Sequence, residues 1–131
     1  MTNAEFNEIF RERTKSFAVK ILKFISVIPF NTATKVMTFQ LGKSGTSVGA
    51  NFRAFCRERS KAEKYSKICI TVVEADECVY WIELFDKADF GNKAELEWLS
   101  SEALEILKVC PKDKIGILTL KETEENRDAK M

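Results

Sequence analysis

A chain of 131 residues, of which 45% are hydrophobic and 31% charged, has the length of one domain and enough apolar residues for one core. It contains no histidine, which removes the commonest general base and metal ligand, and its 5 glycines and 2 prolines are few for the many turns of a β-fold. No apolar run approaches the ~20 residues of a membrane helix, and the first residues lack the pattern of a signal peptide, so we expect a cytoplasmic protein with no membrane partner.

Charge is distributed unevenly along the chain. Residues up to Lys67 include 13 Lys and Arg against 5 Asp and Glu, whereas from Ile68 onward the counts are 8 and 15, so the two parts carry net charges of +8 and −7. A basic region of this kind predicts contact with nucleic acid, or with the acidic surface of a neighbouring copy.

Residues 3–28 are predicted to form the first helix, which Asn3 can cap and Pro29 ends. One face of it combines apolar residues with two cations at steps of three and four: Phe6, Phe10, Arg13, Phe17, Lys20, Phe24 and Ile28. Further apolar residues lie beside this stripe, so the apolar surface is too wide for a single seam and suggests contact with another subunit.

The second helix is predicted from Thr32 or Ala33 to Arg59, capped by Thr32 or Thr34. Its three glycines, at 42, 45 and 49, each cost roughly 1 kcal/mol relative to alanine, so either the helix breaks there or the small residues let another helix approach closely. The small residues at 42, 46, 49, 50 and 54 favour the second alternative, a continuous and tightly packed helix.

Two capping boxes predict the starts of the last two helices. Ser60 with Glu63 opens a helix to Lys87 or Asp89, and Asn92 with the residues after it opens one to Val109. Long helices with short connections give an all-α, antiparallel up-down-up-down four-helix bundle, here assigned to residues 1–120. Within this span, residues 115–120 could form a short strand or a last helical turn, and residues 121–131 are expected to be a disordered C-terminal tail.

The sequence offers no catalytic, cofactor-binding or metal-binding residues. Gly42-Lys43-Ser44 resembles the end of a phosphate-binding loop, but the glycine required five residues earlier is Met37 and the approach is helical. The third helix carries several carboxylates, but carboxylate-bridged metal sites in bundles also use histidine. The four cysteines form no CxxC pair and are expected to be small buried thiols in a reducing compartment: Cys56, Cys69, Cys78 and Cys110.

Arg13 interrupts the apolar stripe of the first helix, so it needs a partner of opposite charge. We predict a buried ion pair with Asp76 or Glu77 on the third helix, which would add register specificity more than stability.

The densest group of cations spans the end of the second predicted helix and the start of the third. This basic cluster consists of Arg53, Arg57, Arg59, Lys61, Lys64 and Lys67, with Phe52, Phe55 and Tyr65 interleaved. One interpretation is binding to a nucleic-acid backbone, with the aromatic residues available for stacking. The other is a solvated helix end that forms salt bridges between subunits.

Several motifs together resemble one known family, and the resemblance extends from about Phe6 to Val109. The motifs are Gln40-Leu41, Ser44-x-Thr46-Ser47-Val48-x-Ala50-Asn51, Cys56-Arg57-x-Arg59-Ser60-Lys61-Ala62-Glu63, Glu74-Ala75-Asp76-Glu77 and Tyr80-Trp81-x-Glu83-Leu84. They are similar to the four-helix-bundle family named for 23S rRNA intervening-sequence proteins. Many members carry Ala-Glu-Gly after the asparagine, where this chain has Arg53-Ala54-Phe55, which places it in a branch with Arg-Ala there.

The resemblance implies a bundle whose protomers assemble into a ring, characteristically a homopentamer, and it implies no settled activity. The family name records genes within insertions in ribosomal RNA genes, and related bundles serve as accessory subunits of retroelement reverse transcriptases. We therefore expect a non-enzymatic, homo-oligomeric protein that binds RNA or DNA through the basic cluster. The alternative is a structural or adaptor module that binds a protein partner, such as a subunit of a nucleic-acid enzyme.

Overall fold

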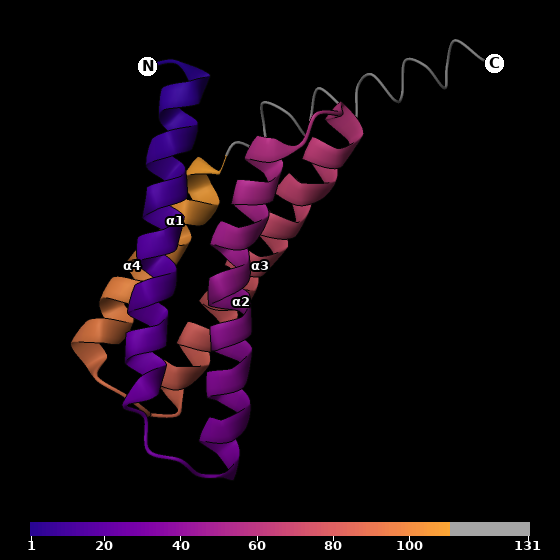
Figure 1. Cartoon of the computed structure of the whole chain (residues 1–131). Helices are drawn as coiled ribbons and strands as arrows, with labels where there is room; N and C mark the ends of the chain where they lie inside the picture. Colours follow the sequence, from indigo (N-terminus) through magenta and orange to yellow (C-terminus); the bar gives the residue numbers. More distant parts are fainter. Residues whose placement is uncertain (111–131) are drawn as a thin grey trace, which may run out of the picture.

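The computed structural model describes residues 1–110, which form four helices: α1 (Asn3–Ser26), α2 (Thr32–Arg57), α3 (Lys61–Lys87) and α4 (Lys93–Val109). The helices run alternately down and up, joined by short connections (Figure 1). The predicted all-α bundle is therefore confirmed. The predicted boundary at residue 120, the apolar segment 115–120 and the tail 121–131 lie outside the described residues.

Polar side chains at the start of each helix define its first residue. Ser60 and Asn92 accept hydrogen bonds from the backbone N–H groups of Glu63 (3.1 Å) and Glu95 (2.9 Å), as predicted. The expected cap of α1 is wrong by one residue, because the Thr2 hydroxyl rather than Asn3 accepts from the N–H of Glu5. The predicted caps of α2 are wrong as well.

Asn31 is the cap of α2, in a capping box with Thr34. Each side chain accepts a hydrogen bond from the other residue's backbone N–H, at 2.8 Å in both directions. Thr34 thus contributes as the third helical residue instead of as the cap.

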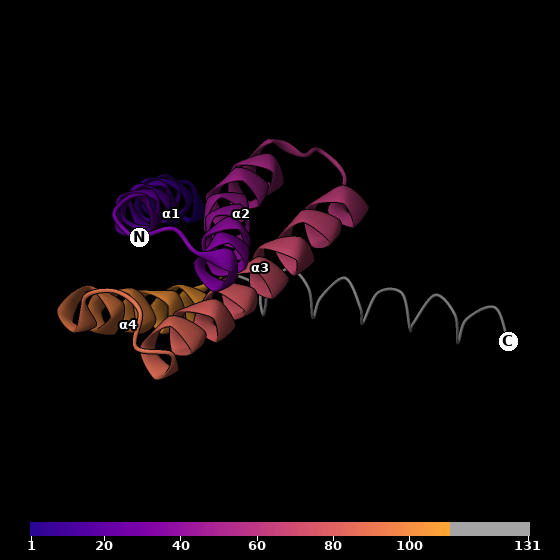
Figure 2. The ribbon, with the colours of Figure 1, turned by 90° about the horizontal axis from the view of Figure 1, so that it is seen from below.

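The helices pack around a square, so each has two neighbours. The backbones approach closely between α1 and α2, α2 and α3, α3 and α4 and, least extensively, α4 and α1, whereas within residues 1–110 the backbones of the diagonal pairs stay apart and meet only through side chains in the core (Figure 2). Aromatic rings connect the layers of the core: Phe10 packs edge-on against Phe52 with centroids 4.6 Å apart, and Phe24 against Phe85 at 5.2 Å.

Glycines allow α1 and α2 to approach closely, and α2 continues through all three of them, as predicted. A Cβ atom on Gly45 would overlap the buried Ile21 side chain, coming within 3.1 Å of its Cγ2. A Cβ on Gly49 would lie 3.4 Å from the carbonyl oxygen of Thr14. Residues with larger side chains at these two positions would push the helices apart.

Two further features bear on the sequence predictions. Of the four cysteines, predicted to be buried thiols, Cys78 and Cys110 are buried, whereas Cys56 and Cys69 are half-buried. None of the helices formed by residues 1–110 is long and apolar enough to span a membrane.

Candidate nucleic-acid interface

The two hairpins of the bundle differ in charge. From Arg13 to Arg57, which covers most of α1 and all of α2, the chain has eight Lys and Arg residues and no Asp or Glu. From Ile68 to Cys110, which covers most of α3 and all of α4, it has ten Asp and Glu against three lysines. Because α1 and α2 lie opposite α3 and α4 in the square, one side of the molecule is basic and the other acidic.

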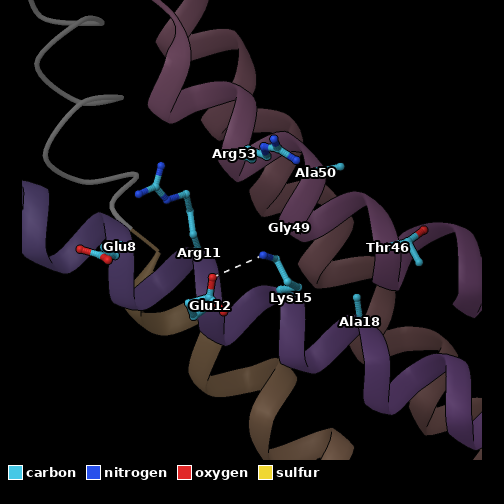
Figure 3. A pocket seen from close by; sticks show the side chains of 9 residues that line it. All are labelled: Glu8, Arg11, Glu12, Lys15, Ala18, Thr46, Gly49, Ala50 and Arg53. Atoms are coloured by element: carbon cyan, nitrogen blue, oxygen red, sulfur yellow. Dashed lines mark hydrogen bonds and ion pairs between the residues drawn. The ribbon is translucent and has the colours of Figure 1, made fainter.

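A groove of about 410 Å³ runs between α1 and α2 on the basic side (Figure 3). Small residues form its floor, because Ala18 faces Thr46, Gly49 and Ala50 where the two helices are closest. We call this site the basic groove. It is open because the residues that would fill it have short side chains or none.

Three cations from two helices line the basic groove. Arg11 and Lys15 lie one turn apart on α1, and Arg53 lies on α2 across from them (Figure 3). Glu8 and Glu12 also line it, and Glu12 forms an ion pair with Lys15 at 3.3 Å. Both partners of that pair are largely exposed, so the pair is weak and leaves the lysine able to exchange partners.

The groove continues along α2 toward its C-terminal end. Arg53 and Arg57 line an adjoining depression with Ala50, Ala54 and Glu58. Four cations, Arg11, Lys15, Arg53 and Arg57, therefore follow one continuous surface on α1 and α2.

The structure divides the predicted basic cluster. Arg53 and Arg57 lie on the basic groove, and Arg59 is exposed in the connection to α3. Lys64 is turned toward the protein, where its Nζ donates to the backbone carbonyl of Phe55 at 3.0 Å and lies 4.8 Å above the Phe55 ring. It stabilises the end of α2, so its ammonium group is engaged within the chain.

The remaining two cations of the cluster are on the first turns of α3. Lys61 is exposed and Lys67 is half-buried. Two carboxylates, Glu58 and Glu63, also lie close together at this end. A hydrogen bond and charge repulsion between them raise the pKa of Glu63. This end of the bundle is therefore more mixed in charge than the sequence suggested.

The predicted stacking by interleaved aromatic residues is wrong for two of the three. Phe52 and Phe55 are buried in the core, with ring centroids 5.5 Å apart. Tyr65 is half-buried, and a hydrogen bond with Cys69 raises the pKa of its hydroxyl. The pattern misled because aromatic residues at steps of three along a helix fit a core face as well as an exposed one.

The predicted pairing of Arg13 with Asp76 or Glu77 is also wrong. Arg13 lies against α4, where its Nε and Nη2 donate to the two carboxylate oxygens of Glu102 at 3.1 and 2.5 Å. The reason is topological, since α1 and α3 are diagonal in the square and their backbones do not approach closely, whereas α4 is a direct neighbour of α1. Asp76 and Glu77 are exposed on α3.

Sequence reasoning missed Arg11 and Lys15. Both are on the first helix, far along the chain from the dense basic cluster. Their spacing of four, followed by Ala18 three residues on, was the available signal, because such spacing puts two cations and a small residue on one helix face.

Two other kinds of site considered from the sequence, a phosphate-binding loop and a metal site, are not formed by residues 1–110. Gly42-Lys43-Ser44 lies within α2, and the buried Ser44 hydroxyl donates to the carbonyl of Gln40 at 2.9 Å, so these residues form no phosphate loop. No group of three or more Cys, Asp or Glu residues in this part of the chain could hold a metal ion.

Comparisons with known proteins agree on one family. A family model described as 23S rRNA-intervening sequence protein matches residues 7–111. The chain is similar to a crystal structure from Bacteroides thetaiotaomicron VPI-5482 of a protein with unknown function from the S23 ribosomal protein family, with 30% identity and a TM-score of 0.70. The alignment covers 78% of this chain and 91% of that one. No curated protein matches the chain.

Proposed function

Starting from the fact that this chain belongs to the 23S rRNA-intervening sequence protein family, we propose that it is a non-catalytic bundle that binds RNA or DNA. The observation that carries this proposal is the convergence of Arg11, Lys15 and Arg53 from two helices on one groove. Binding is directed to the phosphate backbone and takes place in the cytoplasm, a compartment that keeps cysteine thiols such as Cys56 and Cys69 reduced.

The arrangement suits a backbone better than base edges. Arg11 and Lys15, like Arg53 and Arg57, are four residues apart, which is about 6 Å along a helix. Two such pairs present a row of positive charge to a row of phosphates. No aromatic side chain lines the basic groove, so the groove itself provides no stacking surface for a base.

We further propose that the protein acts as a homo-oligomer, with a pentameric ring as the expected form. The opposite charges of its two sides support this, because a head-to-tail contact joins the basic side of one copy to the acidic side of the next. The acidic side has a groove of its own between α3 and α4, lined by Glu83, Asp86 and Glu97. In such a ring, some cations of α1 and α2 contact the neighbouring copy and the others contact nucleic acid.

The second candidate function is an adaptor module for a protein partner. It is favoured by exposed apolar side chains near the connection of α1 and α2, namely Phe30, Val36 and Phe39. Replacing these with serine separates the candidates. An adaptor would lose its partner, whereas a nucleic-acid-binding protein would keep its affinity for RNA.

The proposal is tested by binding of a fluorescently labelled RNA duplex, followed by anisotropy at 0.1 M salt. The variant Arg11→Gln with Arg53→Gln removes two cations of the groove, and Lys35→Gln with Lys87→Gln removes two exposed cations that lie outside it. Loss of two phosphate contacts is expected to weaken binding on the order of fiftyfold at this salt concentration.

The control variant should bind within about a factor of two of the unaltered protein. Equal affinities of the two variants would count against the basic groove. Because Arg53, Lys35 and Lys87 are exposed and Arg11 is only half-buried, the melting temperatures of both variants should stay close to that of the unaltered chain. Sizing of both variants shows whether the lost cations also held subunits together.

A further inference from the structure

A second groove, of about 430 Å³, lies between the C-terminal half of α1 and the first turns of α4. It forms where the square is most open, since α1 and α4 make the least extensive contact of the four neighbouring pairs. The buried side chains of Phe24 and Leu99 are at its base, and Val27, which is 72% exposed, is on its rim. We call it the tryptophan groove. Its volume is in the lower part of the range of small-ligand sites.

Trp98 lines this groove and is 43% exposed, which is unusual for the largest aromatic side chain in a protein with an apolar core. The ammonium group of Lys20 lies 4.9 Å from the centroid of its ring. One face of the indole therefore contacts a group that does not belong to α4, here the Lys20 ammonium. The same face can accept another cation or a flat ring.

The charged residues of the groove favour an anionic ligand. Lys20 and Lys23 come from α1 and are opposed by one carboxylate, Glu95. Beyond Glu12 the whole of α1 lacks carboxylates, so nothing else on that helix neutralises the two lysines. A fitting ligand combines a flat apolar ring with negative charge a few ångströms away.

We propose that the tryptophan groove binds an unpaired base of a single-stranded nucleic acid. The base stacks on Trp98, and the phosphates on either side of it are held by Lys20 and Lys23. A duplex cannot use this site, because its bases are stacked on one another and paired. Lys20 leaves the indole for a phosphate as the base takes its place.

This inference goes beyond the proposed function, because the site lies on another side of α1 and requires an unpaired strand. The two sites make different use of nucleic acid: the basic groove holds a backbone, and the tryptophan groove holds a base. Each can be removed without altering the residues of the other.

The test uses the fluorescence of Trp98. Since the chain has two tryptophans, Trp81→Phe leaves Trp98 as the single emitter. This protein is titrated with a ten-residue oligothymidine and with a DNA duplex of the same length. Saturable quenching by the single strand and none by the duplex is expected, because only the strand can place a base on the indole.

Affinity of labelled oligothymidine for variants provides the second readout. Trp98→Ala is expected to weaken binding about tenfold and Trp98→Phe less, because phenylalanine keeps a ring for stacking. Lys20→Gln with Lys23→Gln should reduce the salt slope by about 1.4, the value for two phosphate contacts of a single strand. Arg11→Gln with Arg53→Gln is the matched control and should leave the quenching in place.

Unchanged Trp98 emission on binding, together with equal affinity of the Trp98→Ala variant, would overturn the inference. If the duplex binds and the single strand causes no quenching, the tryptophan groove is overturned and the basic groove is retained. If the single strand causes quenching and the duplex does not bind, the basic groove is overturned and the tryptophan groove is retained. A fold defect in Trp98→Ala would appear as a lowered melting temperature, in which case Trp98→Phe and the lysine variants decide.

Discussion

The close approach of α1 and α2, which creates the basic groove, should depend on the absence of a side chain at Gly45. In Gly45→Ala, alanine gains about 1 kcal/mol of helix propensity. The new methyl group meets Ile21, which is fully buried, so any shift of the Ile21 side chain presses on the close-packed core around it. Overpacking of this kind costs about 1–3 kcal/mol, so we expect a net loss of about 1 kcal/mol and a melting temperature about 4 °C lower.

A double-mutant cycle separates the overlap from other effects. Ile21→Val removes the outermost methyl of that side chain, so Gly45→Ala on this background should become neutral or stabilising, with a coupling of about 1–2 kcal/mol measured by urea unfolding. Gly42→Ala is the matched control, because its Cβ would meet the end of the half-buried Ile25 side chain, 3.0 Å away, which can turn aside. If Gly45→Ala stabilised the protein equally with and without Ile21→Val, the tight contact would be refuted.

Three further predictions concern groups that the fold places in unusual surroundings. Arg13→Gln and Glu102→Gln should each destabilise the protein by about 1 kcal/mol, because the two side chains of the bidentate pair are only 34% and 17% exposed. The double variant should lose less stability than the sum of the two single losses, and additive losses in urea unfolding would contradict the pairing. Burial, more than the nearby Glu77, raises the pKa of Glu74, whose Oε2 is buried and accepts no hydrogen bond from residues 1–110. The cost of its charge to stability is therefore absent below the pKa of the unfolded carboxyl and grows as the pH rises through the folded pKa. Glu74→Gln should therefore raise the melting temperature at pH 7 and leave it unchanged at pH 3, and equal gains at both would be evidence against the charge. Burial raises the pKa of the Cys78 thiol to about 12, so iodoacetamide at pH 8 should modify it only after unfolding, and mass spectrometry of the native protein showing rapid alkylation there would contradict this.

The helices were predictable because their signals are local. Ser60, Asn92 and Pro29 mark helix ends through caps and backbone restrictions that act within a few residues. The small residues of α2 also predicted a close helix contact. The sequence could not say that Thr46 and Ala50 line an open groove while Gly45 makes the contact, because residues one position apart on a helix point about 100° apart.

The partners of charged residues were less predictable, since they depend on which helices are neighbours. Arg13 required a carboxylate, but in a square of four helices one of the other three is diagonal and its backbone is farther away, and the sequence does not say which. The same limit applies to the basic groove. Arg53 and Arg57 were visible as a cluster, whereas Arg11 and Lys15 joined them only through the packing of α1 on α2.

The central claim is that the cations of the basic groove bind a phosphate backbone, and the salt dependence of duplex binding tests it most directly. If Arg11, Lys15, Arg53 and Arg57 each neutralise one phosphate, a plot of log K against log salt concentration has a slope of about −3.6 for one protomer. Affinity should then fall on the order of a hundredfold between 50 and 200 mM salt. Contacts from several copies of a ring would steepen the slope. A slope near zero, or no binding at 50 mM salt, would contradict the account.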